Sequence, residues 1–144
     1  ALKKLPREMQ RKELQRALRP AANLIRDVAR MNAPQGESFS RKLRGKQWDH
    51  DAGNLRKAIA VRTEKKKYRR NLAQLRIGVL HDKRNPNNGA WYWRFVEFGT
   101  SKMPAQPFLV PAFESSKYAA NDMIKRSLLK GLERQAKRVR GRRR

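Results

Sequence analysis

The sequence of 144 residues contains no cysteine and only two histidines. Without cysteine there is no disulfide framework, no thiolate metal site and no cysteine nucleophile. No apolar run approaches the roughly 20 residues that a membrane-spanning helix needs, and the first residues lack the long apolar segment of a secretory signal. We therefore expect a protein that is in the cytosol when it is synthesised.

Acidic residues are also scarce, because 12 Asp and Glu stand against 37 Lys and Arg, giving a net charge of +25. No single tail explains this excess: residues 1–45 and 46–90 each carry 12 basic and 4 acidic side chains, and residues 91–144 carry 13 and 4. Such a surface repels itself and attracts polyanions or acidic proteins. Nucleic acid is therefore the first partner class to consider.

The hydrophobic pattern predicts an α+β domain over residues 1–136, followed by a basic tail over 137–144. Apolar residues at helical spacing predict an N-terminal helix over 7–32, which Pro20 should kink or divide into two. Residues 33–53 are polar and punctuated by glycine and serine, so we interpret them as an irregular, flexible loop. The whole is expected to contain a small antiparallel sheet of about three to four strands and a long C-terminal helix.

Three segments supply the expected strands. Residues 55–63 indicate a turn that leads into a strand, and residues 72–80 alternate apolar and polar side chains as a half-buried strand does. Residues 91–98 are aromatic on both faces, which is typical of a strand buried between two layers or between subunits. Residues 99–110 contain glycine and two prolines and therefore predict an extended arm, and Pro111 suits the first turn of the last helix.

Few residues offer catalytic chemistry. His50 and His81 each have an aspartate beside them, and a small metal-dependent nuclease would use such residues as metal ligands or as a base. No further ligands surround them, so we favour turn residues in water. There are no paired carboxylates, no phosphate-binding glycine loop and no nucleophile elbow. We expect a protein that is not an enzyme, with no catalytic residues, no metal and no cofactor.

Two basic segments could contact DNA or an acidic partner. The first is a predicted hairpin tip around Tyr68, which could bind phosphates and stack on a base or could simply be solvated. The second is the C-terminal tail, for which nucleic acid or an acidic neighbour is favoured over solvation. Their cationic residues are Lys65, Lys66, Lys67, Arg69 and Arg70 in the first, and Arg138, Arg140, Arg142, Arg143 and Arg144 in the second.

The most specific stretch is residues 91–114, where an aromatic segment runs into V-E-F-G-T, then a proline-containing arm, then P-F-x-x-P-A-F. This order resembles the head–tail joining, or neck and tail-completion, family of long-tailed lambdoid phages. The segment G-x-L-R-x-x-I at residues 53–59 and the helix that ends before Pro34 are also similar to that family. The similarity in layout covers residues 14–135.

The resemblance implies a virion protein of the head–tail junction, assembled in the host cytoplasm. It would form a ring, with six subunits expected, that joins or seals the tail to the DNA-filled head. Its neighbours would be head-closure and tail-terminator or tail-tube proteins and the packaged DNA end, with no membrane. The implied fold and assembly determinants are Trp91, Trp93, Phe95, Val96, Glu97, Phe98, Gly99, Thr100, Pro104, Pro107, Phe108, Pro111 and Phe113.

Physical reasoning about this stretch adds three expectations. Glu97 lies among aromatic residues, so its carboxylate should pair with a cation or with backbone N–H groups. Gly99 should have a backbone geometry that other residues resist, and Phe108 and Phe113 should lock the arm onto the core on either side of Pro111. The alternative function, suggested by charge alone, is a basic nucleic-acid-binding module.

Overall fold

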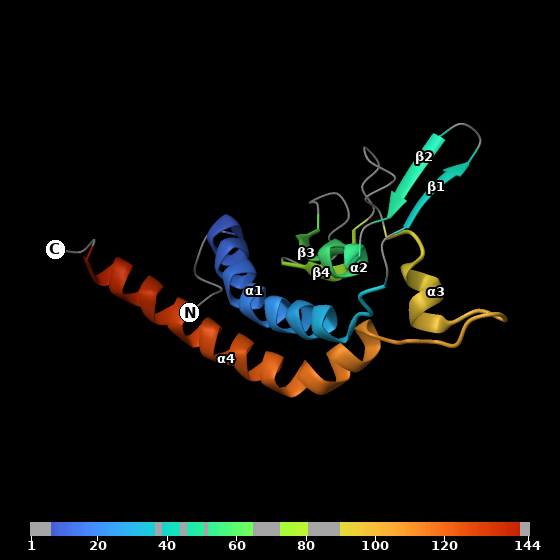
Figure 1. The fold of residues 1–144 in the computed structure, drawn as a ribbon. Coiled ribbons are helices and arrows are strands. Elements are labelled where there is room, and N and C mark those ends of the chain that lie inside the picture. The colour runs from blue at the N-terminus through green and yellow to red at the C-terminus, as the bar shows by residue number, and fades with distance from the viewer. Residues whose placement is uncertain are drawn as a thin grey trace. The chain divides into compact units, whose positions relative to one another are not determined.

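A computed structural model describes residues 7–36, 39–43, 46–50, 52–64, 73–80 and 90–141. The fold is α+β, as predicted (Figure 1). In chain order its elements are α1 (Arg7–Asn32), β1 (Phe39–Leu43), β2 (Lys46–His50), α2 (Asn54–Ala58), β3 (Ile59–Thr63), β4 (Leu75–Val79), α3 (Trp93–Phe98) and α4 (Leu109–Gly141).

Helix α1 confirms the predicted N-terminal helix. It is assigned without a break through Pro20, so the alternative of two separate helices is excluded and a kink at Pro20 stays a prediction. Its buried apolar positions, including Ala17, Ala21 and Ala29, carry small side chains. The helix ends where the N–H of Ala33 donates to the Ala29 carbonyl at 3.0 Å, directly before a proline that disfavours further helix.

Strands β1 and β2 correct the prediction that residues 33–53 are irregular. The two strands pair in antiparallel register, from Phe39 opposite His50 to Leu43 opposite Lys46. The pairing was missed because neither strand alternates apolar and polar residues. Backbone hydrogen bonds form a strand pair whatever the side chains are, so a polar hairpin leaves little trace in the hydrophobic pattern.

Strands β3 and β4 confirm the two strands predicted over residues 55–63 and 72–80. Backbone bonds join Glu64 to Gln74 at 3.1 Å and Leu80 to Ala58 at 2.8 Å, so the strands run in opposite directions. The prediction of one sheet with three to four strands is wrong, because the described strands pair as two separate sheets of two. The missing contributor is the segment at residues 91–98, which is not a strand.

Helix α3 replaces that predicted strand. The N–H of Trp93 donates to the Ala90 carbonyl at 3.0 Å and that of Val96 to the Tyr92 carbonyl at 3.3 Å, which builds a turn and then a helix. A short run that is apolar on all sides does not by itself distinguish a buried strand from a helix. The residues that flank this run, an alanine before it and a glycine after it, are compatible with a strand and with a helix.

Helix α4 begins two residues before Pro111, which therefore lies in the first turn as predicted. It continues to Gly141, through most of the predicted tail, so the helix does not end near the expected boundary at residue 136. That boundary and the single-domain organisation stay predictions. No helix in the described part of the chain is long and apolar enough to cross a membrane.

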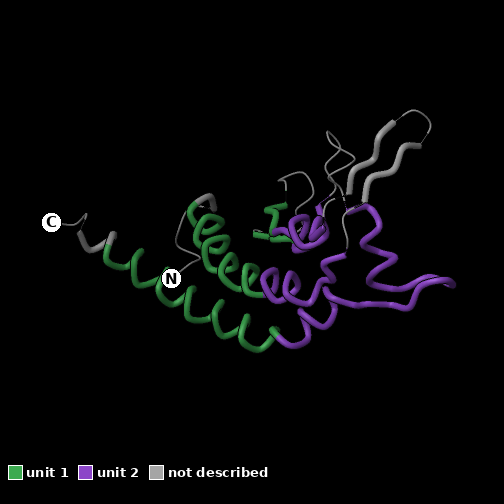
Figure 2. Tube along the Cα trace, viewed as in Figure 1, with its two compact units in different colours: residues 1–24, 61–76, 116–144 green, residues 25–60, 77–115 purple. Residues whose placement is uncertain are grey.

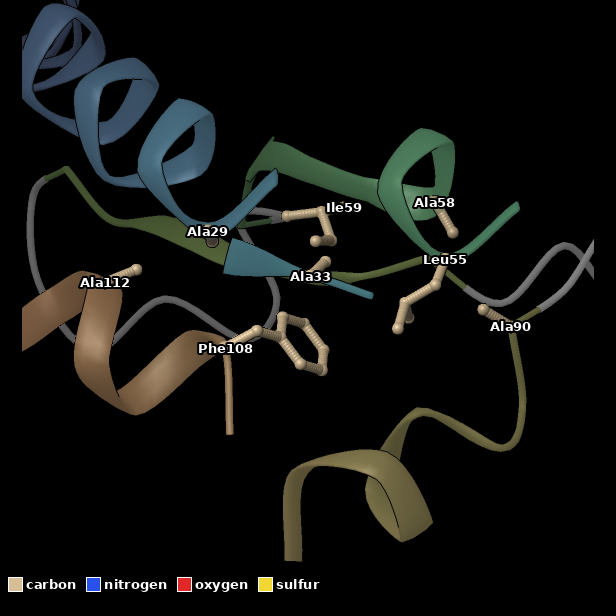
Figure 3. Close-up of a cluster of buried hydrophobic side chains, with 8 residues drawn as sticks. All are labelled: Ala29, Ala33, Leu55, Ala58, Ile59, Ala90, Phe108 and Ala112. Atoms are coloured by element: carbon tan, nitrogen blue, oxygen red, sulfur yellow. The ribbon is translucent and has the colours of Figure 1, made fainter. Parts of the chain in front are cut away.

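The chain divides into two compact units (Figure 2). Unit 1 comprises residues 1–24, 61–76 and 116–144, and unit 2 comprises residues 25–60 and 77–115. Unit 2 contains a hydrophobic cluster in which the last turn of α1, α2 and the start of α4 meet (Figure 3). The buried members of this cluster are Ala29, Ala33, Leu55, Ala58, Ile59, Ala90, Phe108 and Ala112.

Candidate assembly surface

The carboxylate of Glu97 caps the N-terminus of α4 from a distance of more than ten residues along the chain. Its side chain is 3% exposed. One oxygen, Oε2, accepts hydrogen bonds from the N–H groups of Phe108 at 2.8 Å and Leu109 at 3.0 Å, while Oε1 accepts from Val110 at 2.9 Å. The first N–H groups of a helix have no partners within it, and the helix dipole favours an anion there. The prediction that Glu97 pairs with backbone N–H groups is confirmed.

Gly99 ends α3 and turns the chain back toward it. Its φ of 73° lies in the left-handed region, and a Cβ at this position would be 2.8 Å from the backbone nitrogen of Ala105. Both observations exclude other residues without rearrangement, as predicted. The arm that follows is fixed to α3, since the N–H of Gln106 donates to the Val96 carbonyl at 2.8 Å.

A short loop closes the arm. The N–H of Thr100 donates to the Met103 carbonyl at 2.8 Å, and that of Met103 donates back at 3.3 Å. This bridge is the one described place where the arm pairs with itself. Pro104 and Pro107, predicted as determinants of the arm, are exposed, and neither belongs to a strand or a helix. The two prolines therefore restrict the backbone of the arm and do not serve as buried packing contacts.

The two phenylalanines on either side of Pro111 have different surroundings. Phe108 is fully buried in the hydrophobic cluster of unit 2 (Figure 3), so it anchors the arm to the core as predicted. Phe113 is 51% exposed, and the prediction that it also locks the arm is wrong. Phe108 precedes the first residue of α4, whereas Phe113 lies within the helix, so helical periodicity does not place the two rings on the same face.

The aromatic residues around α3 divide in the same way. Trp93 and Val96, together with Tyr92, are partly buried against the cluster, and burial raises the pKa of the Tyr92 hydroxyl. Trp91 and Phe98 are 61% and 70% exposed, and Phe95 is also exposed. Trp91 and Phe95 contact each other edge to face, with 6.0 Å between ring centroids. Residues 91–98 were predicted to be buried on both faces, and within this chain only one face is buried.

The exposed aromatic residues of this segment and of the start of α4 are candidates for contacts with another molecule, and we define them as the candidate assembly surface: Trp91, Phe95, Phe98 and Phe113. All four belong to unit 2. Soluble monomers rarely expose several large apolar groups in one region unless the region contacts another molecule. The Glu97 cap and the Gly99 turn hold the segments that carry these side chains.

Two arginines in unit 2 have positioning roles that the sequence did not reveal. The guanidinium of Arg30 donates twice to the Ile59 carbonyl, at 2.8 and 3.0 Å. That of Arg56 donates to the Ala33 carbonyl at 2.7 Å, which satisfies an acceptor at the end of α1. In a chain with so many basic residues, nothing in the pattern distinguished these two.

The structure does not describe the side chains of the remaining predicted site residues. Residues 65–70, His81 and residues 142–144 lie outside the described residues. Arg138 and Arg140 belong to α4, and His50 belongs to β2, but their side chains are not described. Among the described residues there is no group of three or more His, Cys, Asp or Glu that could hold a metal ion.

Comparison with known proteins identifies a family. A family model described as "Bacteriophage HK97-gp10, putative tail-component" matches residues 1–99, which is more than half of the chain. The match includes α1, the four strands and α3, and it ends at Gly99. No curated protein matches significantly, and neither does any solved structure.

Proposed function

Because the chain belongs to the HK97-gp10-like family of phage tail components, we propose that it is a structural virion protein of the head–tail junction. In this proposal several copies, six by expectation, form a ring that joins or seals the tail to the DNA-filled head. The ring assembles in the host cytoplasm and contacts head-closure and tail-terminator or tail-tube proteins. The protein is not an enzyme and needs no cofactor.

One observation carries the proposal: the assembly surface exposes aromatic side chains on a rigid support. Phe98 is the most exposed of these, and it lies beside Glu97, whose carboxylate is bonded to three N–H groups of α4. Aromatic residues held in place lose little conformational entropy on binding and serve as anchors at protein interfaces. In a closed ring the same surface would meet a complementary surface on the next copy.

The experiment is complementation of a phage that lacks its own copy of the gene. The variant Phe98→Ser removes an exposed anchor without touching the core, so we expect normal folding but filled heads without attached tails in electron micrographs. Tyr118→Ser is the matched control, because Tyr118 is an equally exposed aromatic residue on α4 in unit 1. It should give infectious particles.

Two results would contradict the proposal. One is normal particles from the Phe98→Ser variant. The other is absence of the protein from purified wild-type particles, measured by quantitative mass spectrometry. A copy number per particle that is a multiple of six would support the ring as stated.

A further inference from the structure

A cleft in unit 1 lies between the middle of α1 and the second half of α4. It has a volume of about 540 Å³. Arg16 lines it from α1, and Lys130, Arg134 and Lys137 line it from α4. Among the described residues of the lining, Glu133 is the one acidic residue, so four described cations face one carboxylate. Of these residues only Lys137 belongs to a basic segment that the sequence singled out, namely the tail over residues 137–144.

A buried carboxylate beneath the cleft orients its two arginines. Glu13 is buried on α1, and its Oε1 accepts from Arg16 Nη1 at 2.9 Å and from Gln135 Nε2 at 3.1 Å. Its Oε2 lies 3.6 Å from Arg134 Nη2. Gly131 leaves room for this carboxylate, since a Cβ there would be 3.0 Å from Oε2. Glu13 therefore holds the Arg16 guanidinium by a hydrogen bond and attracts the Arg134 guanidinium through a longer ion pair.

The arginines keep most of their hydrogen-bonding capacity for another molecule. The side chains of Arg16 and Arg134 are 60% and 59% exposed, although each contacts Glu13. A guanidinium has five N–H donors, and the described contacts with Glu13 use one nitrogen of each. Within the described residues, Lys130 and Lys137 form no salt bridge. The cleft thus presents oriented cationic donors to solvent.

The spacing along α4 suits a chain of anions better than a single ion. Lys130, Arg134 and Lys137 are four and three residues apart, so they follow one face of the helix. With a rise of about 1.5 Å per residue the line extends over about 10 Å. Phosphates along one strand of duplex DNA advance about 3.4 Å each along the helix axis, so a line of cations of this length can meet more than one of them.

The lining also distinguishes nucleic acid from an acidic protein. Protein interfaces depend on aromatic and aliphatic anchors in desolvated pockets. Among the described residues that line this cleft there is no aromatic residue, and the apolar contributor is Pro20. Contacts to phosphate need only cations and small donors such as the hydroxyl of Ser127. Absence of aromatic rings in the lining also disfavours single strands, which proteins bind by stacking on bases.

We propose that this cleft binds the phosphate backbone of duplex DNA without sequence preference. The inference goes beyond the structural role proposed above and uses a different unit of the chain, so each can fail without the other. Binding through phosphates releases counterions, and the logarithm of the affinity then falls linearly with the logarithm of salt concentration, by about 0.9 per phosphate.

The test measures the affinity of the full chain for a fluorescently labelled duplex of mixed sequence over a series of salt concentrations. The double variant Lys130→Gln with Lys137→Gln should flatten the slope by about two units, because it removes two phosphate contacts. The matched control is Lys57→Gln with Lys102→Gln, which removes the same charge from exposed positions in unit 2. Its slope should stay that of the wild type, as should that of Phe98→Ser.

Three outcomes would overturn the proposal. Equal flattening in both double variants would mean that DNA responds to total charge and not to the cleft. An unchanged slope in Lys130→Gln with Lys137→Gln would mean that the cleft does not touch phosphates. If this variant keeps its DNA affinity but loses binding to poly-glutamate, the occupant is an acidic protein.

Discussion

At the scale of single residues, Glu97 joins two segments that are far apart in the chain. Its buried carboxylate accepts from three consecutive N–H groups at the start of α4, while its own backbone belongs to α3. A carboxylate that is removed from water must recover its lost hydration through such bonds. Charge-assisted bonds of this kind are about twice as strong as neutral ones, so the residue contributes to stability as well as to position.

The first prediction at this scale is that Glu97→Gln lowers the free energy of unfolding by about 1–3 kcal/mol. The amide keeps one acceptor oxygen but turns an NH₂ group toward backbone donors, so at least one N–H loses its partner. Urea unfolding followed by circular dichroism measures the change. Glu133→Gln removes the same charge from an exposed site and should stay within about 0.5 kcal/mol of wild type. Equal losses in both variants would mean that the Glu97 cap contributes nothing specific.

At the scale of elements, the start of α4 connects the core to the assembly surface. The motif P-F-x-x-P-A-F places Phe108 in the hydrophobic cluster, Pro111 in the first helical turn and Phe113 at the surface. Proline is tolerated at that position because its missing N–H would have no partner within the helix. This motif lies beyond Gly99, where the family match ends, so its role here follows from the geometry.

The two phenylalanines of that motif should respond differently to the same truncation. Phe108→Ala leaves a cavity among buried side chains and should cost about 3–5 kcal/mol of unfolding free energy. Phe113→Ala removes a half-exposed ring and should cost less than about 1 kcal/mol, while impairing assembly if it belongs to the proposed interface. Thermal and urea unfolding of the isolated variants measure the first effect, and complementation measures the second. A large stability loss in Phe113→Ala would contradict the division between core and surface.

At the scale of the whole molecule, the charge of +25 determines which molecules the protein attracts and which it repels. Its distribution over all parts of the sequence keeps single copies apart in solution, and apolar anchors or acidic partners must overcome this repulsion during assembly. The basic cleft of unit 1 and the aromatic surface of unit 2 would then serve different neighbours. The proposed structural role assigns no chemical step to either.

We accordingly expect no nuclease activity from the full chain. Supercoiled plasmid incubated with the protein and Mg²⁺ or Mn²⁺ should remain supercoiled, because we propose no metal site and no nucleophile. The double variant His50→Ala with His81→Ala, purified in the same way, controls for a contaminating nuclease and should leave complementation intact. Cleavage that needs the metal and disappears in the double variant would show that the two histidines are catalytic.

The sequence by itself determined those features that depend on local pattern. Helical spacing predicted α1 and α4, alternation predicted β3 and β4, and the special positions of Gly99 and Pro111 followed from what these residue types allow. It also anticipated that the Glu97 carboxylate would pair with a cation or with backbone N–H groups, since an unpaired carboxylate among aromatic residues is costly to bury. The resemblance to the phage head–tail joining family also rested on residues that are adjacent in the chain.

Only the tertiary structure decided the features that depend on distant contacts. The run from Trp91 to Phe98 is apolar on all sides, and packing against Phe108 and its neighbours made it a helix with one buried face. Donors for Glu97 came from residues 108–110, a pairing that no spacing rule indicates. The cleft likewise requires Arg16 and Lys130 to meet across more than a hundred residues. The local pattern predicts which side chains are buried, but only the packing determines which residues they contact.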